Sequence, residues 1–123
     1  MTQSAPLRIL IIDDEPMVAK SLSRVLKAHS LRIVDNVDDA LATLHHEAAD
    51  LIFCDMMMPQ KTGIDFYNAI VQTFPQLHNV IIFMTGGVFT PETHAFIDSV
   101  PNDVVQKPFD IYEIRLLVKQ YCT

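Results

Sequence analysis

The sequence predicts a doubly wound α/β fold, in which helices cover both faces of a parallel sheet. Short apolar runs of the kind that form buried parallel strands recur five times along the 123 residues. Segments whose apolar residues follow helical spacing separate these runs, so strand and helix alternate. Such alternation calls for parallel strands joined by right-handed crossovers. A closed barrel of eight strand–helix units is disfavoured, since it would need about twice this length.

The expected strands are rich in Ile, Leu, Val and Phe. Four of them directly precede polar residues: "RILII" (8–12), "LIFC" (51–54), "VIIFM" (80–84) and "VV" (104–105). A fifth run, "LRIV" (31–34), is weaker. Five such strands in a chain of this length predict a flavodoxin-like (βα)5 sheet with strand order 2-1-3-4-5.

Helices are expected between and after these strands. The first begins at Pro16, because proline suits the first helical turn, and its apolar residues then follow at helical spacing. The second lies around residues 37–44 and the third from about 64 to 74. The last two begin at "TPET" (90–93), where a threonine N-cap precedes a proline, and at "DIYE" (110–113), a capping-box pattern.

Length and composition predict one domain, residues 1–123, without an effector domain. The net charge of -6 disfavours direct binding to nucleic acid, which needs a basic surface. No apolar run approaches the roughly 20 residues of a membrane span, so membrane insertion is not expected. Cys54 and Cys122 lack the spacing of a metal knuckle or a redox pair, and a reduced, cytoplasmic location is expected.

Polar residues follow the expected strands at the points where they end. Asp13 and Asp14 follow the first strand, Asp55 the third, Thr85 the fourth, and Lys107 comes just after the fifth. In a doubly wound sheet, ligands bind outside the carboxyl ends of the strands, where strand order reverses. We therefore expect these five residues to converge on one edge of the sheet, although they lie up to 94 positions apart.

The chemistry of this group points to a cation and a phosphoryl group. Three crowded carboxylates repel one another unless a cation neutralises them. Mg²⁺ prefers oxygen ligands, whereas Zn²⁺ is disfavoured because no histidine or cysteine is among these residues. The Thr85 hydroxyl and the Lys107 ammonium could then hold phosphoryl oxygens. A carboxylate in such a pocket can attack phosphorus, and Asp55, which stands alone on its strand, is the best candidate.

These residues, at these spacings, resemble the receiver domain of two-component response regulators. The match covers essentially the whole chain, from "ILIIDDEP" through "DMMMPQKTG" and "MTGG" to "KPF". The resemblance implies that Asp55 accepts a phosphoryl group from a sensor histidine kinase or a histidine phosphotransfer protein. It also implies phosphoryl contacts from Thr85 and Lys107. The stretch "MTGGVFTPE" looks like receivers of hybrid sensor histidine kinases.

The resemblance further implies a bound Mg²⁺ ion. Its ligands would be Asp13, Asp14, Asp55 and the backbone carbonyl of Met57. The peptide bond between Lys107 and Pro108 is usually cis in this family, and X-Pro bonds accept that geometry at a cost of only about 0.5 to 1 kcal/mol.

One position departs from the family pattern. Receivers commonly carry an aromatic residue three positions before the lysine, whose rotamer couples to the threonine. This chain has Val104 there, a short side chain with little rotameric reach. Three phenylalanines could take over its role: Phe83, Phe89 and Phe109. A rearranged loop after Gly86 and Gly87 is the other route by which the output could be produced.

The leading interpretation is a signalling switch and not an enzyme. Phosphorylation would draw Thr85 and its loop inward and alter a surface on the last two helices and the fifth strand. A downstream protein, or a second copy in a homodimer, could bind there. Neither Met57 nor Gly87, two positions after Asp55 and Thr85, can activate water, so self-dephosphorylation is expected to be slow.

Two other functions stay open from the sequence. A phosphorylation-silent interaction module would keep the fold and signal through partners alone. A small aspartyl-phosphate phosphatase is disfavoured, because Met57 replaces the second acid common in such enzymes and no cap domain is present.

Two of the motifs also have structural interpretations. The two aspartates of "DDEP" could cap the following helix, and Asp14 or Glu15 could interact favourably with its dipole; capping is compatible with metal binding. Met56, Met57 and Met58 are expected as gap-filling or loop side chains, since thioethers beside carboxylates make a poor metal site.

Overall fold

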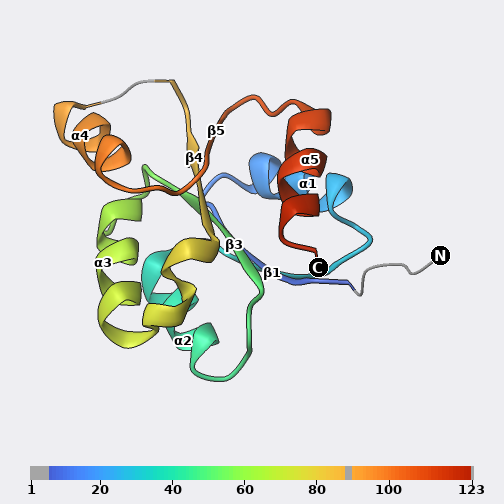
Figure 1. Cartoon of the computed structure of the whole chain (residues 1–123), viewed down its shortest axis with the longest axis horizontal. Coiled ribbons are helices and arrows are strands. Elements are labelled where there is room, and N and C mark those ends of the chain that lie inside the picture. Colours follow the sequence, from blue (N-terminus) through green and yellow to red (C-terminus); the bar gives the residue numbers. More distant parts are fainter. Residues whose placement is uncertain (1–5, 88–89, 123) are drawn as a thin grey trace.

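The computed structural model describes residues 6–87 and 90–122, which form a parallel sheet between two layers of helices (Figure 1). The strand order is β2-β1-β3-β4-β5, and every pairing is parallel. The strands are β1 (Arg8–Ile12), β2 (Ser30–Val34), β3 (Leu51–Asp55), β4 (Ile81–Thr85) and β5 (Val104–Gln106). The predicted flavodoxin-like class and its strand order are confirmed.

The helices alternate with the strands along the chain. They are α1 (Pro16–Val25), α2 (Val37–Leu44), α3 (Gly63–Thr73), α4 (Pro91–Ser99) and α5 (Ile111–Gln120), with a 3-10 turn, η1 (Pro75–Val80), before β4. In Figure 1, α1 and α5 lie on one side of the sheet, and α2, α3 and α4 lie on the other. No helix in residues 6–87 and 90–122 combines the length and the apolar character needed to cross a membrane.

Side-chain caps define the starts of four helices. Thr90 and Asp110 cap α4 and α5 as predicted, each accepting hydrogen bonds from backbone amides of the first turn. Asn36 caps α2 in the same way. A reciprocal capping box forms at Thr62 and Asp65 at the start of α3, a pair that the sequence analysis did not single out.

The predicted start of the fourth strand is shifted by one residue. The fourth strand was expected from residue 80, but Val80 belongs to η1 and β4 begins at Ile81. A hydrogen-bonding side chain far along the sequence holds this turn: the Asn102 amide donates to the carbonyls of His78 at 2.7 Å and Ile81 at 2.8 Å. The turn therefore depends on a tertiary contact that local spacing does not reveal.

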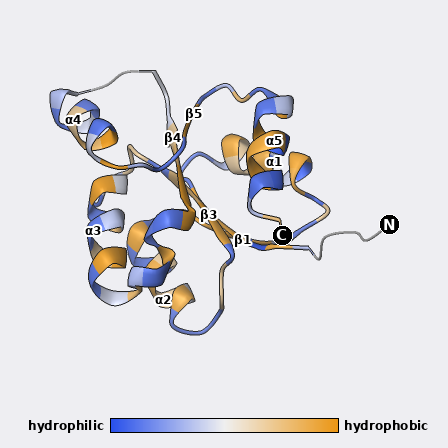
Figure 2. Cartoon of the chain, viewed as in Figure 1, coloured by the Kyte–Doolittle hydropathy of each residue, from blue (hydrophilic) through white to orange (hydrophobic). Residues whose placement is uncertain are grey.

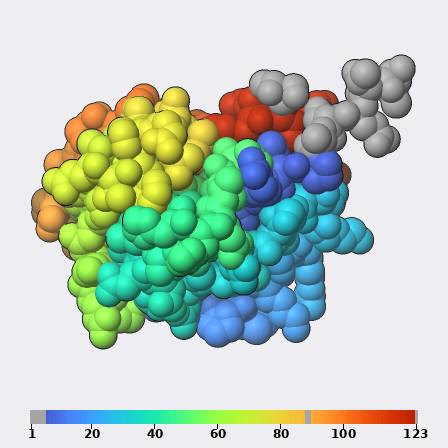
Figure 3. Space-filling view, turned by 90° about the horizontal axis from the view of Figure 1, so that it is seen from below, coloured from blue at the N-terminus to red at the C-terminus, as the bar shows by residue number. Residues whose placement is uncertain are grey.

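The two faces of the sheet bury separate hydrophobic clusters. Every residue of β3 and β4 is buried, and Figure 2 shows the hydrophobic colour along these central strands. Successive side chains alternate between faces, so Phe53 packs with α1 and α5 while Phe83 packs with α3 and α4. Atoms from the start of the described chain (dark blue) lie next to atoms near its end (red) in the space-filling view (Figure 3), and residues of β1 and α5 share the cluster on the α1 and α5 face. Burial on both faces explains why the strands appear as continuous apolar runs.

The loop between β3 and α3 is tightly packed. Met56 and Met58 are buried in the core, as gap-filling side chains were expected to be, whereas Met57 is 50% exposed. The Gly63 amide donates to the Met56 carbonyl at 3.1 Å. A Cβ at Gly63 would lie 3.0 Å from the Asp55 carbonyl oxygen and 2.9 Å from the Met56 sulfur. Only glycine lets the chain return this closely beneath the end of β3.

We predict that Gly63→Ala lowers the free energy of unfolding by about 1 to 3 kcal/mol, because the added methyl overpacks against backbone atoms of the loop. Urea unfolding followed by circular dichroism measures this change. Gly86→Ala is the matched control: its Cβ would meet nothing within 4 Å, so the same substitution should shift stability by less than about 1 kcal/mol. Equal stability of the two variants would contradict this account of the loop.

Candidate functional site

The strand ends converge as predicted. Ile12 pairs with Cys54, so Asp13 follows β1 beside Asp55, the last residue of β3. Thr85 ends β4, and its carbonyl accepts a hydrogen bond of 2.8 Å from the Lys107 amide after β5. Asp13, Asp55 and Thr85 are each only 2% exposed. Segments far apart in sequence thus bring an ammonium, a hydroxyl and carboxylates to one edge of the sheet.

Lys107 forms ion pairs with three acids of this site. Its Nζ lies 2.8 Å from Asp13 Oδ2, 3.1 Å from Glu15 Oε1 and 3.2 Å from Asp55 Oδ2. Burial opposes the charged form, but the hydrogen bond to Asp13 and the charge of Asp55 outweigh it and raise the pKa of Lys107 above its usual range. The lysine is therefore a fixed positive charge. The peptide bond that follows it, to Pro108, is cis, as the resemblance implied.

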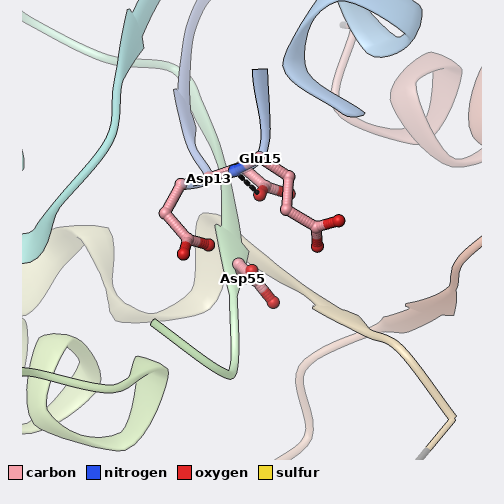
Figure 4. Close-up of side chains that lie close together, drawn as sticks. Asp13, Glu15 and Asp55 are labelled. Carbon is pink, nitrogen blue, oxygen red and sulfur yellow. Dashed lines mark hydrogen bonds between the residues drawn. The ribbon is translucent and has the colours of Figure 1, made fainter. Parts of the chain in front are cut away.

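A compact group of acids faces this lysine. Asp13, Asp14, Glu15 and Asp55 each offer a carboxylate oxygen, and these oxygens lie within 4.8 Å of one another. Figure 4 shows Asp13, Glu15 and Asp55 gathered at the ends of the strands, with the Glu15 amide donating to Asp13 Oδ1 at 2.8 Å. Hard oxygen donors at this density suit a divalent cation such as Mg²⁺. The donor set therefore fits the expected metal.

Glu15 is a site residue that the sequence analysis did not include. It is the third letter of "DDEP" and holds the N-cap position of α1, but its side chain makes no capping bond and reaches Lys107 instead. The favourable interaction with the helix dipole that the sequence suggested for it stays a prediction. Its place within the motif was the only sign in the sequence, because nothing local indicates a partner 92 positions away.

Asp55 lies in an environment that opposes its ionisation. Burial and the charge of Asp13 raise its pKa to about 6, while the Met57 amide, which donates to Oδ1 at 3.2 Å, and Lys107 act in the opposite direction. Near neutral pH the carboxylate is still the main form. A cation among the neighbouring acids would favour it further, since opposite charge lowers a carboxyl pKa.

The hydroxyl of Thr85 is buried and has no hydrogen-bond partner among the described residues. A buried polar atom without a partner is costly, which makes it a sign of a missing ligand. A hollow of about 500 Å³ lies beside it, with Val104 and Gln106 of β5 in its wall. The short side chain of Val104 thus lines the same open space as Thr85.

Of the three phenylalanines considered as replacements for the missing aromatic, two lie within the described residues and Phe89 lies outside them. Phe109 packs into the cluster on the α1 and α5 face, away from Val104, which packs on the opposite face. Phe83 lies on the same face as Val104 and contacts the ring of Phe96 of α4, with centroids 5.4 Å apart. Phe83 therefore lies on the same strand as Thr85 and contacts α4 through Phe96.

Comparison with known proteins agrees with this architecture. The sequence matches the response regulator receiver domain over residues 9–119. The chain is 27% identical over 116 residues to the probable transcriptional regulatory protein TcrX of Mycobacterium tuberculosis, covering 93% of this chain and 49% of that protein. It is 28% identical over 120 residues to the transcriptional regulatory protein DltR of Streptococcus agalactiae, covering 93% of this chain and 53% of that protein. The chain spans about half the length of these curated relatives.

A solved structure gives the same result. The crystal structure of a putative response regulator from Chloroflexus aurantiacus superposes with a TM-score of 0.83 at 26% identity, over 95% of this chain and 98% of that one. The chain belongs to the response regulator receiver domain family, which confirms the resemblance noted from the sequence. It is thus a receiver domain of the two-component system.

We predict that Asp55 makes the metal-free protein less stable as pH rises. Because its pKa is raised from 3.8 to about 6, the folded chain binds this proton more tightly than the unfolded chain. The contribution of this proton to the free energy of unfolding is about 2 to 3 kcal/mol. It is present in full below about pH 4 and is lost by about pH 6. In urea unfolding with EDTA present, the free energy of unfolding of the unaltered chain should fall relative to that of Asp55→Asn as the pH rises across that range.

The control for this measurement is Asp35→Asn, which removes an exposed acid just after β2. This variant keeps the Asp55 carboxyl, so we expect it to lose stability between about pH 4 and pH 6 as the unaltered chain does. A parallel course for Asp55→Asn as well would show that the Asp55 carboxyl titrates equally in the folded and unfolded states.

Proposed function

We propose that this receiver accepts a phosphoryl group on Asp55, in a Mg²⁺-dependent reaction, from a sensor histidine kinase or a histidine phosphotransfer protein. The single observation that carries the proposal is the position of the Asp55 carboxylate. It lies within 3.2 Å of the Lys107 ammonium and inside a group of acids that suits a divalent cation. It also ends the strand next to Thr85, whose buried hydroxyl has no partner among the described residues.

The proposed reaction requires the residues to form one covalent bond and otherwise to position groups and neutralise charge. A carboxylate oxygen of Asp55 forms a bond to phosphorus as the bond from phosphorus to the donor's imidazole nitrogen breaks, and the electron pair of that bond returns to the imidazole. The transition state is loose, so the protein's task is mainly to position groups and neutralise charge. Lys107 supplies a fixed positive charge and Thr85 a hydroxyl donor for the transferred oxygens.

Asp13, Asp14, Asp55 and the carbonyl of Met57 are the groups proposed to hold Mg²⁺. The bound ion would supply charge neutralisation for the carboxylates and the phosphoryl oxygens. The position of Asp13 and Asp55, buried and directed to the same point, supports this assignment. Asp14 is half-buried and belongs to the same group of acids.

The proposed role is a switch that assists its own phosphorylation and not an enzyme with turnover. Neither Met57 nor Gly87 offers a group that could orient or activate water near the acyl phosphate, so the phosphorylated state should be long-lived. Gly87 has a φ of 92°, a conformation that favours glycine and keeps a side chain from this position. Because Cys54 and Cys122 are both free thiols, we place this exchange in the cytoplasm, a reducing compartment.

For the output we propose a protein target, or a second copy of the chain, bound through α4, β5 and α5. Support comes from two large apolar side chains on α5: Tyr112 is 76% exposed and Leu116 is 65% exposed. They are four positions apart and so share one face of the helix. Such a pair has little reason to face water unless another surface covers it.

The test of phosphoryl transfer is incubation with Mg²⁺ and acetyl phosphate, followed by intact mass measurement. We expect the mass to rise by one phosphoryl group in the unaltered chain and in the control Glu47→Gln, which alters an exposed glutamate paired with Arg32. Asp55→Asn should show no adduct. An adduct retained in Asp55→Asn would place the phosphoryl group elsewhere, and no adduct in any variant would favour the phosphorylation-silent interaction module.

The same sample separates a switch from a phosphatase. After the donor is removed, we expect the adduct to persist well beyond minutes, because Met57 and Gly87 cannot assist water. Continuous release of phosphate with many turnovers, or decay of the adduct within seconds, would contradict the proposed switch and favour the enzyme.

The proposed output face is tested by sedimentation of the phosphorylated and unphosphorylated chain. If a second copy binds through α5, phosphorylation should increase the sedimentation coefficient, and Leu116→Ser should reduce that increase. Val71→Ser, which removes a 45% exposed apolar side chain from α3, is the matched control and should leave it unchanged. Equal effects of the two substitutions would count against an interface on α5.

A further inference from the structure

Three carboxylates share the single ammonium of Lys107. Carboxylate oxygens of Asp13, Glu15 and Asp55 lie within 3.2 Å of its Nζ, and the contact with Glu15 Oε1 is a hydrogen bond. The lysine side chain is only 12% exposed, so little room is left for water to replace a lost partner. The charge of Lys107 is therefore compensated by these carboxylates.

The three carboxylates are not equivalent. The side chains of Asp13 and Asp55 are 0% and 3% exposed, whereas that of Glu15 is 61% exposed. The backbone of Glu15 is held at both ends, since its amide donates to Asp13 and its carbonyl accepts from the first turn of α1. Glu15 therefore combines an anchored backbone with a long side chain that can change its orientation.

Metal binding and the present lysine contacts involve the same two carboxylates. A divalent cation held by Asp13 and Asp55 would be a second positive charge close to the Lys107 ammonium, which lies within 3.2 Å of both side chains, and the two charges would repel. Lys107 must then weaken its contacts to those two acids. Glu15 is the one of its three partners that the proposed metal site does not require.

We propose that Glu15 is a positioning residue for Lys107, retaining the ammonium at the mouth of the pocket while Asp13 and Asp55 hold the cation. The inference rests on the proposed function, because it assumes the metal site described there. A largely buried ammonium with no partner is costly, so Glu15 lowers the cost of moving Lys107 aside. It thereby strengthens cation binding through the lysine and without contacting the cation.

A direct metal ligand would also strengthen cation binding, and Glu15 belongs to the group of acids that could hold one. The two roles differ in their dependence on Lys107. A residue that acts through the lysine has no effect once the lysine is gone, whereas a ligand acts in either case. A double-mutant cycle separates them.

The experiment measures Mg²⁺ binding to the full chain by isothermal titration calorimetry, with no phosphoryl donor present. We expect Glu15→Gln to weaken Mg²⁺ binding by about fivefold when Lys107 is present, the size of effect typical of an exposed ion pair. In the Lys107→Met chain, Glu15→Gln should weaken binding no more than the control does. That control is Glu47→Gln, which removes an exposed glutamate paired with Arg32 at a distance from the site.

Two results of the double-mutant cycle would overturn the proposal. An equal loss with and without Lys107 would make Glu15 a metal ligand, and no loss in either chain would show that Lys107 moves aside without it. Unaltered Mg²⁺ binding together with failure of Asp55 phosphorylation would overturn the proposed function alone, whereas no Mg²⁺ binding by the unaltered chain would overturn the metal site and this inference together. If Lys107→Met does not fold, Lys107→Gln, which keeps a hydrogen-bond donor without the charge, completes the cycle.

Discussion

The ion pairs of Lys107 with two buried carboxylates are the interaction on which the site depends. Asp13 and Asp55 lie side by side with almost no exposure, and such a pair would repel strongly if both were ionised without a counter-charge. The ammonium, placed within 3.2 Å of both, allows them to stay charged and close together. It also ties the end of β5 to the ends of β1 and β3, so that the charge balance and the geometry of the strand ends depend on one another.

The parallel sheet is what makes this arrangement possible. Because β1, β3, β4 and β5 run in the same direction, their carboxyl ends meet at one edge and bring carboxylates, a hydroxyl and an ammonium together. The return loop beneath Asp55, with Gly63 packed against it, keeps the end of β3 in a single position. The core supplies rigidity through strands buried on both faces, and the loops carry the chemistry.

The site is arranged for groups that come from outside the chain. The raised pKa of Asp55 and the unsatisfied hydroxyl of Thr85 both oppose the stability of the protein on its own. In the proposed function, a cation would relieve the first and a phosphoryl oxygen the second. Binding energy would then favour a state in which Thr85 and its neighbours are drawn to the phosphoryl group, as a population shift requires. The contact of Phe83 with Phe96 lies next to that strand and is a physical link from it to α4.

By itself the sequence determined the fold class, the strand order and which strand-end residues come together. Continuous apolar runs predict strands buried on both faces, and residues placed at their ends must meet in any sheet of this topology. Only the tertiary structure decided which groups touch. The ion pair of Glu15 with Lys107, the turn held by Asn102 and the opposite faces of Phe83 and Phe109 all depend on contacts between distant segments. The spacing of residues along the sequence does not indicate such contacts, because side-chain positions and packing are decided only when the helices and strands come together.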